Sequence, residues 1–92
     1  DKLYREILKL TEKTKSKVEI ANCYSDMGLM EIRKGNYEKA ISCYNNSIKI
    51  YEGLGTEDYL YIVNANIGLI YLKLDNYEQA IEYTKKAAKF AK

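Results

Sequence analysis

The sequence predicts an all-α solenoid, a stack of similar helical units, because the chain repeats itself and contains no proline. Gly28-Leu29 recurs as Gly68-Leu69. Asn36-Tyr37-Glu38 recurs as Asn76-Tyr77-Glu78. Both pairs are separated by the same step of about forty residues, and a fixed period of this size is typical of stacked units that bury their apolar faces against one another. The chain has no proline, so its helices can run without interruption.

Apolar and small residues recur every three or four positions, which places them on one face of a helix. The clearest such face consists of Tyr37, Ala40, Ile41, Tyr44, Ile48 and Tyr51. Followed along the chain, this periodicity predicts five helices, at residues 2–13, 17–34, 37–52, 57–74 and 77–91.

Residues that favour helix ends lie between these segments. Ser16 and Glu19 form a capping-box pattern, in which each side chain satisfies a backbone amide of the first turn. Gly35 suits the left-handed backbone that ends a helix, and Asn36 suits the start of the next one. Asp75 takes the place of Gly35 in the second unit, as a poorer substitute for glycine.

We expect residues 1–92 to form a single domain that begins inside a repeat. Leu3-Tyr4 aligns with Cys43-Tyr44, which lies in the second helix of the following unit. The chain therefore divides into the second helix of a truncated repeat and two full repeats, at residues 1–16, 17–56 and 57–92. A start inside a repeat and without an initiator methionine indicates a piece of a longer protein.

The composition excludes several classes of function. The net charge is +2 with both signs interspersed, so we expect no basic field of the kind that holds nucleic acid. No apolar run approaches the roughly 18–20 residues that span a bilayer, which argues against membrane insertion. Cys23 and Cys43 fit neither a disulfide framework nor a metal site, and we interpret them as half-buried thiols of a cytoplasmic protein.

The repeated positions resemble those of the tetratricopeptide repeat, whose pattern is an aromatic residue, a Leu-Gly pair, a second aromatic, an alanine and an aromatic in the second helix. The two full units supply Tyr24, Met27, Gly28, Ala40 and Tyr44, and then Ile67, Gly68, Tyr71 and Ala80. Gly28 and Ala40 are expected to be small because two helices touch there. The step of about forty residues exceeds the usual period of about 34, which resembles the extended variety found in bacterial regulatory proteins and in adaptors.

The resemblance leaves little support for catalysis. Glu31 is the nearest candidate acid, because it occupies a place where the family has a core aromatic; the alternative is that Glu31 pairs with Lys34. The chain has no histidine to activate a serine or cysteine or to bind a metal ion. Many of the ten tyrosines occupy the family's core positions, which favours packing over stacking on nucleic-acid bases. We therefore predict no enzyme, no cofactor and no metal.

The resemblance also implies a right-handed superhelix of antiparallel helix pairs, whose first helices line a concave groove. Carried over by position, the groove consists of Asn22, Ser25, Asp26, Leu29, Ile32, Arg33, Ile62, Ala65, Asn66, Leu69, Leu72 and Lys73. It combines an apolar floor with amides and with one cation at the far end of each helix. Such a surface suits a protein or peptide segment with apolar anchors and one carboxylate. We interpret the chain as a non-catalytic scaffold for protein–protein interaction.

Two other functions are compatible with the sequence. Both ends of the stack would expose apolar faces, so a homo-oligomer joined through the stack ends is one alternative. The other alternative is a sensory or regulatory segment of a larger signalling protein. Leu69 and Leu72 can also be explained by packing between repeats, because residues 57–74 are apolar almost all round.

Overall fold

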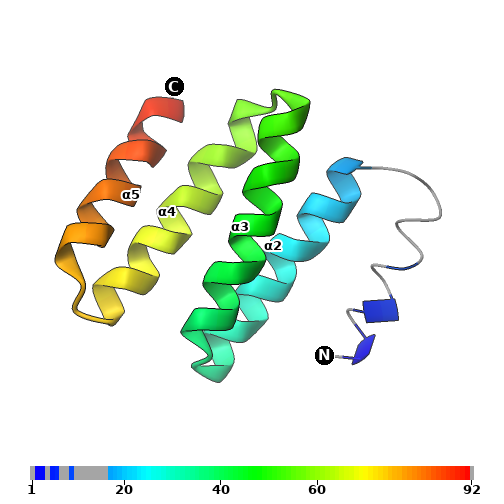
Figure 1. Cartoon of the computed structure of the whole chain (residues 1–92), viewed down its shortest axis with the longest axis horizontal. Helices are drawn as coiled ribbons and strands as arrows, with labels where there is room; N and C mark the ends of the chain where they lie inside the picture. Colours follow the sequence, from blue (N-terminus) through cyan, green and yellow to red (C-terminus); the bar gives the residue numbers. More distant parts are fainter. Residues whose placement is uncertain (1, 4, 7–8, 10–16, 92) are drawn as a thin grey trace.

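The computed structural model describes residues 2–3, 5–6, 9 and 17–91, and this part of the chain contains four helices (Figure 1). They are α2 (Lys17–Lys34), α3 (Tyr37–Leu54), α4 (Glu57–Lys73) and α5 (Tyr77–Phe90). The all-α prediction is confirmed, and each of these four helices ends within two residues of its expected bounds. The expected count of five is not matched, because the helix predicted at 2–13 lies in large part, and the capping residue Ser16 lies wholly, outside the described residues.

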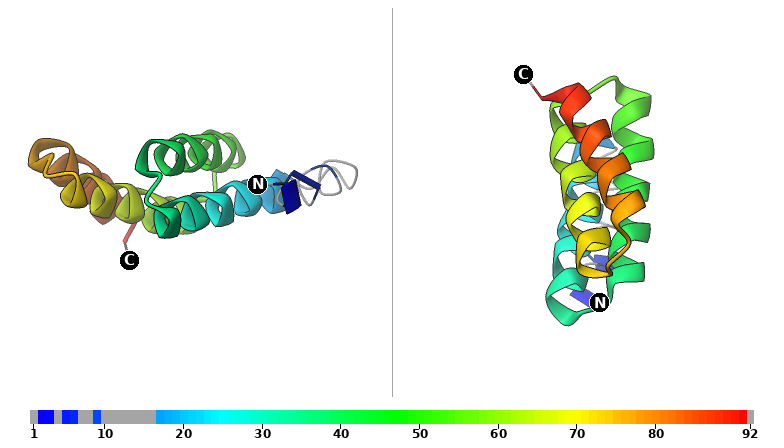
Figure 2. Two further views of the ribbon diagram at one scale, coloured as in Figure 1. Left: turned by 90° about the horizontal axis from the view of Figure 1, so that it is seen from below. Right: turned by 90° about the vertical axis from the view of Figure 1, so that its left-hand side faces the viewer.

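The helices alternate in direction and follow one another across the molecule in chain order (Figure 1). α2 packs against α3, α3 against α4, and α4 against α5. In the view from below, α2 and α4 run along one level and α3 lies to one side of them (Figure 2). The described helices therefore form two antiparallel pairs, α2–α3 and α4–α5, which is the arrangement expected of stacked repeats.

The turns after α2 and α4 use the left-handed backbone that the sequence predicted. Gly35 has a φ of 81°, and Asp75 has a φ of 59° at the equivalent position of the second unit. The side chain of Asp75 accepts a hydrogen bond from the Tyr77 hydroxyl at 3.3 Å. Aspartate is one of the few residues that tolerates this conformation, because its short polar side chain can bond locally.

The two asparagines that precede the second helices behave differently. Asn76 caps α5, since its side-chain oxygen accepts a hydrogen bond from the backbone N–H of Gln79 at 3.3 Å. Asn36 occupies the N-cap position of α3, as predicted, but its side chain makes no bond to the first turn. Its side-chain amide instead donates to the carboxylate of Glu31, so no side-chain cap bond forms. The second unit has Tyr71 in place of Glu31, which leaves Asn76 without this competitor.

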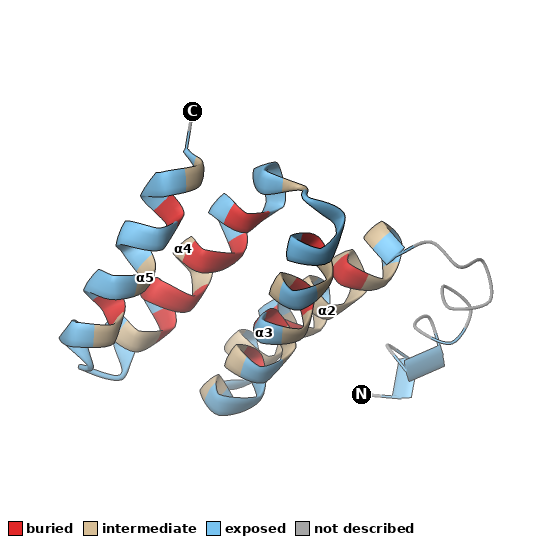
Figure 3. Cartoon of the chain, turned by 45° about the horizontal axis from the view of Figure 1, so that its top comes forward, coloured by how far each residue is buried: buried red, intermediate tan, exposed pale blue. Residues whose placement is uncertain are grey.

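The buried residues lie on the sides of the helices that face neighbouring helices (Figure 3), and most of them form one core cluster. Its members are Ala21, Ala40, Tyr44, Tyr51, Leu60, Val63, Ile67 and Ile70. The glycines of the repeat pattern mark the closest approaches of the paired helices. A Cβ atom on Gly28 would lie 2.9 Å from the Tyr44 ring, and one on Gly68 would lie 3.0 Å from the Thr84 hydroxyl. The predicted helix–helix contacts at these glycines are confirmed.

Asn64 and Thr84 stand where the first unit has Tyr24 and Tyr44, and each forms a hydrogen bond with the backbone of its own helix. Asn64 is buried, and its amide donates to the backbone carbonyl of Leu60 at 2.9 Å. The Thr84 hydroxyl donates to the backbone carbonyl of Ala80 at 2.7 Å. Because a buried polar group without a partner is costly, these bonds explain how the second unit accommodates the replacements.

We predict opposite effects for two glycine-to-alanine substitutions. Gly28→Ala should lower the free energy of unfolding by about 1–3 kcal/mol, because the new methyl group meets the Tyr44 ring. Gly53→Ala should raise it by about 0.5–1 kcal/mol, because Gly53 lies inside α3 with nothing within 4 Å of the added carbon. Urea unfolding at unchanged m-value measures both changes. A stabilising Gly28→Ala would contradict the close approach of α2 and α3.

Candidate functional site

Six of the residues predicted for the groove line one hollow of about 450 Å³ between α2 and α4. These six are Asn22, Ser25, Asp26 and Leu29 of α2, and Ile62 and Asn66 of α4. Val63, Tyr59 and two tyrosines of α3 complete the lining. The repeat explains why they meet, because it places the same face of each unit's first helix on the same side of the stack. We call this hollow the α2–α4 groove.

Two tyrosines of α3 form the floor of the groove. Tyr44 and Tyr51 are each only 1% exposed. The Tyr51 hydroxyl donates to the side-chain oxygen of Asn22 on α2. The amide of Asn66 on α4 donates to the Tyr44 hydroxyl at 3.5 Å. The ring of Tyr59 stacks on that of Tyr51, with centroids 4.9 Å apart. Contacts with the two buried tyrosines therefore hold the side chains of Asn22, Asn66 and Tyr59 in place.

A chain of hydrogen bonds fixes the polar wall on α2. Ser25 donates to the hydroxyl of Ser47 at 3.0 Å, and Ser47 donates to the backbone carbonyl of Ala21 at 2.8 Å. Ser47 is fully buried in α3. Because these hydroxyls are already bonded to the core, the wall needs little rearrangement before it meets a ligand.

The rim of the groove is apolar and acidic. Leu29 is 44% exposed and Ile62 is 53% exposed, so each offers apolar surface from one side of the hollow. Asp26 is exposed and is the one charged residue in the lining. The groove therefore has a negative charge, that of Asp26, beside an apolar contact surface, and the two cations that the sequence placed at its far end do not line it.

The remaining predicted groove residues lie elsewhere. Part of the set lines a second hollow, of about 510 Å³, together with residues of α5: Ala65, Leu69 and Leu72. Ile32 is partly buried and packs against the core. Arg33 and Lys73 are exposed in the last turns of α2 and α4 and do not line the α2–α4 groove.

Sequence reasoning missed three tyrosines of the groove. Tyr44 was assigned to the structural motif alone, and Tyr51 and Tyr59 were given no role in binding. A signal was present, because a tyrosine at a buried position needs a partner for its hydroxyl and so has to reach a polar neighbour or the surface.

Burial changes the acidity of the two floor tyrosines. It raises the pKa of Tyr44, and the hydrogen bond with Asn66 opposes this rise without cancelling it. Burial likewise raises the pKa of Tyr51, against the opposing effect of Ser25. Both hydroxyls are therefore protonated at neutral pH and meet the groove as neutral hydrogen-bonding groups.

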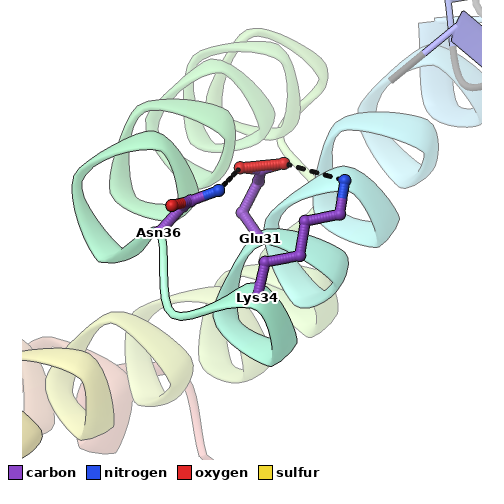
Figure 4. A network of polar contacts seen from close by, with 3 residues as sticks. All are labelled: Glu31, Lys34 and Asn36. Carbon is purple, nitrogen blue, oxygen red and sulfur yellow. Dashed lines mark hydrogen bonds and ion pairs between the residues drawn. The ribbon is translucent and has the colours of Figure 1, made fainter.

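The candidate acid Glu31 has a structural role. Its carboxylate lies 3.8 Å from the Lys34 ammonium group, which confirms the expected pairing, and it accepts a hydrogen bond from Asn36 at 3.1 Å (Figure 4). The ion pair lies within the last turn of α2, and the hydrogen bond with Asn36 joins this turn to the start of α3. Burial, and next the charge of Glu31, raise the pKa of the half-buried Cys43 thiol. A raised pKa disfavours the thiolate, which is the nucleophilic form of cysteine.

Comparison with known families identifies the repeat. The family model described as tetratricopeptide repeat matches residues 19–92, which is most of the chain. The chain belongs to the tetratricopeptide repeat family. No match to a curated protein or to a solved structure was found. Tetratricopeptide repeats generally mediate protein–protein interaction and are generally non-catalytic. None of the helices described above is long and apolar enough to cross a membrane.

We predict that the buried tyrosines of this tetratricopeptide repeat chain make it less stable in alkali. Their folded-state pKa lies above the ordinary value of 10.0, so above that pH the folded protein keeps protons that the unfolded chain has lost. The stability that Tyr44 and Tyr51 contribute is therefore complete below pH 10 and decreases as the pH rises further. Thermal melts across this range measure the decrease.

The double variant Tyr44→Phe, Tyr51→Phe should show a smaller alkaline decrease in Tm than the native chain. Tyr61→Phe is the control, because Tyr61 is exposed and its ring does not line the groove. An alkaline decrease that is the same in the native chain and in the double variant would contradict the burial of these hydroxyls.

Proposed function

We propose that the chain is a non-catalytic scaffold that binds a peptide or helix of a partner protein in the α2–α4 groove. Membership of the tetratricopeptide repeat family supports protein–protein interaction in general. The observation that supports the location is that six predicted residues line one hollow, and that three of them, Asn22, Ser25 and Asn66, are bonded to side chains of α3. A site that is formed before binding loses little conformational entropy when it is filled.

Leu29 and Ile62 are the proposed apolar contacts. They face the same hollow from α2 and α4, and the aromatic floor between them excludes water from an inserted side chain. Apolar groups that become fully buried at the centre of an interface contribute most of its binding energy. The partner segment should therefore carry a large apolar side chain that enters between these two residues.

The polar groups of the groove define the rest of the partner. Asp26 favours a lysine or arginine next to the apolar anchor, in place of the carboxylate expected from the sequence. Asn22 and Asn66 each have more hydrogen-bonding capacity than the single bond to a tyrosine uses. Their amides are suited to the backbone of an extended or helical segment.

Selection from a displayed random-peptide library, with the whole chain as bait, tests this proposal. Enriched peptides should combine a large apolar residue with a basic one. Ile62→Glu should weaken their binding by about 1–2 kcal/mol, because it places a charge where the apolar anchor is buried. Asp26→Asn should mainly slow association and reduce its dependence on salt.

The matched control is Ile81→Glu. Ile81 is 56% exposed, close to the 53% of Ile62, but it lies on α5 and does not line the groove. Circular dichroism and melting temperature verify that each variant is folded. Selected peptides that bind Ile62→Glu as tightly as the native chain would show that the groove is not the binding site.

A further inference from the structure

A third hollow, of about 550 Å³, lies between the second helices of the two units, α3 and α5. Both helices pack against α4, and α4 lies between them (Figure 1). None of the residues that line this hollow lines the α2–α4 groove. The hollow is therefore a separate site, which we call the α3–α5 groove.

The floor of the α3–α5 groove is apolar and belongs to the folded core. Ile48 of α3 and Tyr83 and Phe90 of α5 line the hollow, and each is half-buried. All three side chains pack against the core cluster. The ring of Tyr83 also stacks on that of Tyr71 in α4, with centroids 5.6 Å apart. This floor is formed before any ligand arrives, and it suits the insertion of one apolar side chain.

One buried polar side chain, Asn64 of α4, also lines the groove. It stands where the first unit has Tyr24 and is only 4% exposed. Its amide donates to the carbonyl of Leu60 at 2.9 Å. An asparagine side chain carries two N–H donors and one acceptor oxygen, so this bond uses only part of its capacity. A ligand in the hollow therefore meets a hydrogen-bonding group as well as apolar surface.

The charge around the hollow is predominantly positive. Lys49 of α3 and Lys86 and Lys89 of α5 line it, together with a single glutamate, Glu52. All four residues are exposed. The ammonium group of Lys86 lies 4.5 Å from the centroid of the Tyr83 ring, so one cation is held beside the apolar floor. This arrangement is complementary to a ligand that combines negative charge with an apolar side chain.

Stabilisation of helix ends accounts for only one of these lysines. Lys89 lies in the last turn of α5, where a cation is stabilised by the helix C-terminus. Lys49 occupies the equivalent position of the first unit, but the last turn of α3 has no basic residue. Lys86 also lies outside the last turn of α5. The positive charge of Lys49 and Lys86 therefore has no such role at a helix end.

We propose that the α3–α5 groove binds an acidic segment of a partner protein. A large apolar side chain of the segment enters the hollow, and its aspartates and glutamates lie beside the lysines. Lysine suits carboxylates whose positions vary, because its ammonium group is a point charge on a flexible stem. This proposal does not depend on the function proposed for the α2–α4 groove, where Asp26 favours a basic segment.

A separate partner fits the α3–α5 groove better than a second copy of the chain does. The chain has one pair of adjacent acidic residues, Glu57 and Asp58. They lie in the first turn of α4, where the helix N-terminus stabilises them. The next residue, Tyr59, stacks on Tyr51. This acidic stretch is thus already used within the chain itself.

Nucleic acid fits the groove less well than an acidic protein segment does. A phosphate backbone is bound along an extended positive track, often with exposed aromatic rings on which bases stack. Here the lysines surround a single hollow, and Glu52 lies among them. The Tyr83 ring is already occupied by Tyr71 and Lys86.

The probe is a synthetic peptide with one phenylalanine between two runs of aspartate and glutamate, joined to an uncharged dye by a glycine linker. It is titrated with the whole chain at about 0.15 M salt, where the Debye length is about 8 Å. Fluorescence anisotropy should show saturable binding with one probe per chain. A peptide with serine in place of phenylalanine, and one with lysine in place of the acidic residues, should each bind about tenfold more weakly or less.

Lys49→Glu and Lys39→Glu form a matched pair for this titration. Lys49→Glu should weaken probe binding about five- to tenfold, because it replaces an attraction in the groove by a repulsion. Lys39 is exposed on the same helix but does not line the groove. It lies about 15 Å from Lys49 along the helix axis, which exceeds the Debye length. Lys39→Glu changes the net charge equally and should weaken binding less than about twofold.

Glu52→Gln provides a test that a loss of folding cannot imitate. It removes the one negative charge from the lining and should tighten probe binding about two- to threefold. Glu38→Gln is its control, because Glu38 is exposed on the same helix and lies outside the groove. Ile62→Glu should leave probe binding unchanged, since Ile62 lines the α2–α4 groove. Either groove proposal can therefore fail alone.

Four results would overturn the proposal. Equal weakening by Lys49→Glu and Lys39→Glu would mean that the probe responds to net charge alone. Equal binding of the serine peptide would remove the role of the apolar floor. A short single-stranded DNA that binds more tightly than the probe, and that Lys49→Glu releases, would make nucleic acid the occupant. A dimer in sedimentation equilibrium that Lys49→Glu abolishes would make a second copy the occupant. Probe binding that requires its phenylalanine and Lys49, but not Lys39, supports an acidic partner segment.

Discussion

The contact between Gly28 and the Tyr44 ring is the constraint on which the rest of the structure depends. A Cβ atom on Gly28 would lie 2.9 Å from the ring, so glycine sets how closely α2 and α3 approach. That approach lets Tyr44 extend past α2 and meet Asn66 of α4 with its hydroxyl. One side chain thus packs the first helix pair, joins it to the second, and forms part of the groove floor.

The second unit repeats this arrangement with a smaller residue, and the two surfaces of the stack differ as a result. Thr84 meets Gly68 closely but cannot extend to a following helix, and its hydroxyl turns back to Ala80. Tyr44 of the first unit thus forms part of the floor of the α2–α4 groove, whereas Thr84 of the second unit lines the hollow beside α5.

The helices of the described region could be predicted from the sequence because they depend on local patterns. The spacing of apolar residues predicted helices α2 to α5. The alignment of Asp75 with Gly35 predicted a left-handed backbone conformation at Asp75. Asn36 lies at the N-cap of α3 as predicted, but local sequence could not show that its side chain bonds instead to Glu31, a residue five positions away that the turn brings near.

The groove could be predicted only in part, for a similar reason. The repeat register identified the α2 and α4 residues that face the hollow. It could not show that Tyr51 of α3 reaches Asn22, nor that Arg33 and Lys73 lie outside the lining, because side-chain reach depends on how closely the helices pack. Asp26, which the sequence placed in the groove, is therefore the one charged residue among those that line it.

These observations describe a stack that is held together from its middle. α4 buries Leu60, Val63 and Ile67 between the two helix pairs, whereas α5 buries only Ala80 and Ala87. Native-state amide hydrogen exchange tests this most directly, because it measures the free energy at which each helix opens. The backbone amides of Tyr44 and Ile67 should exchange only through global unfolding, and those of α5 near Ile81 should exchange earlier through separate opening of that helix. Amides in α5 that are as strongly protected as those of α4, or an α3–α4 junction that opens first, would contradict the account.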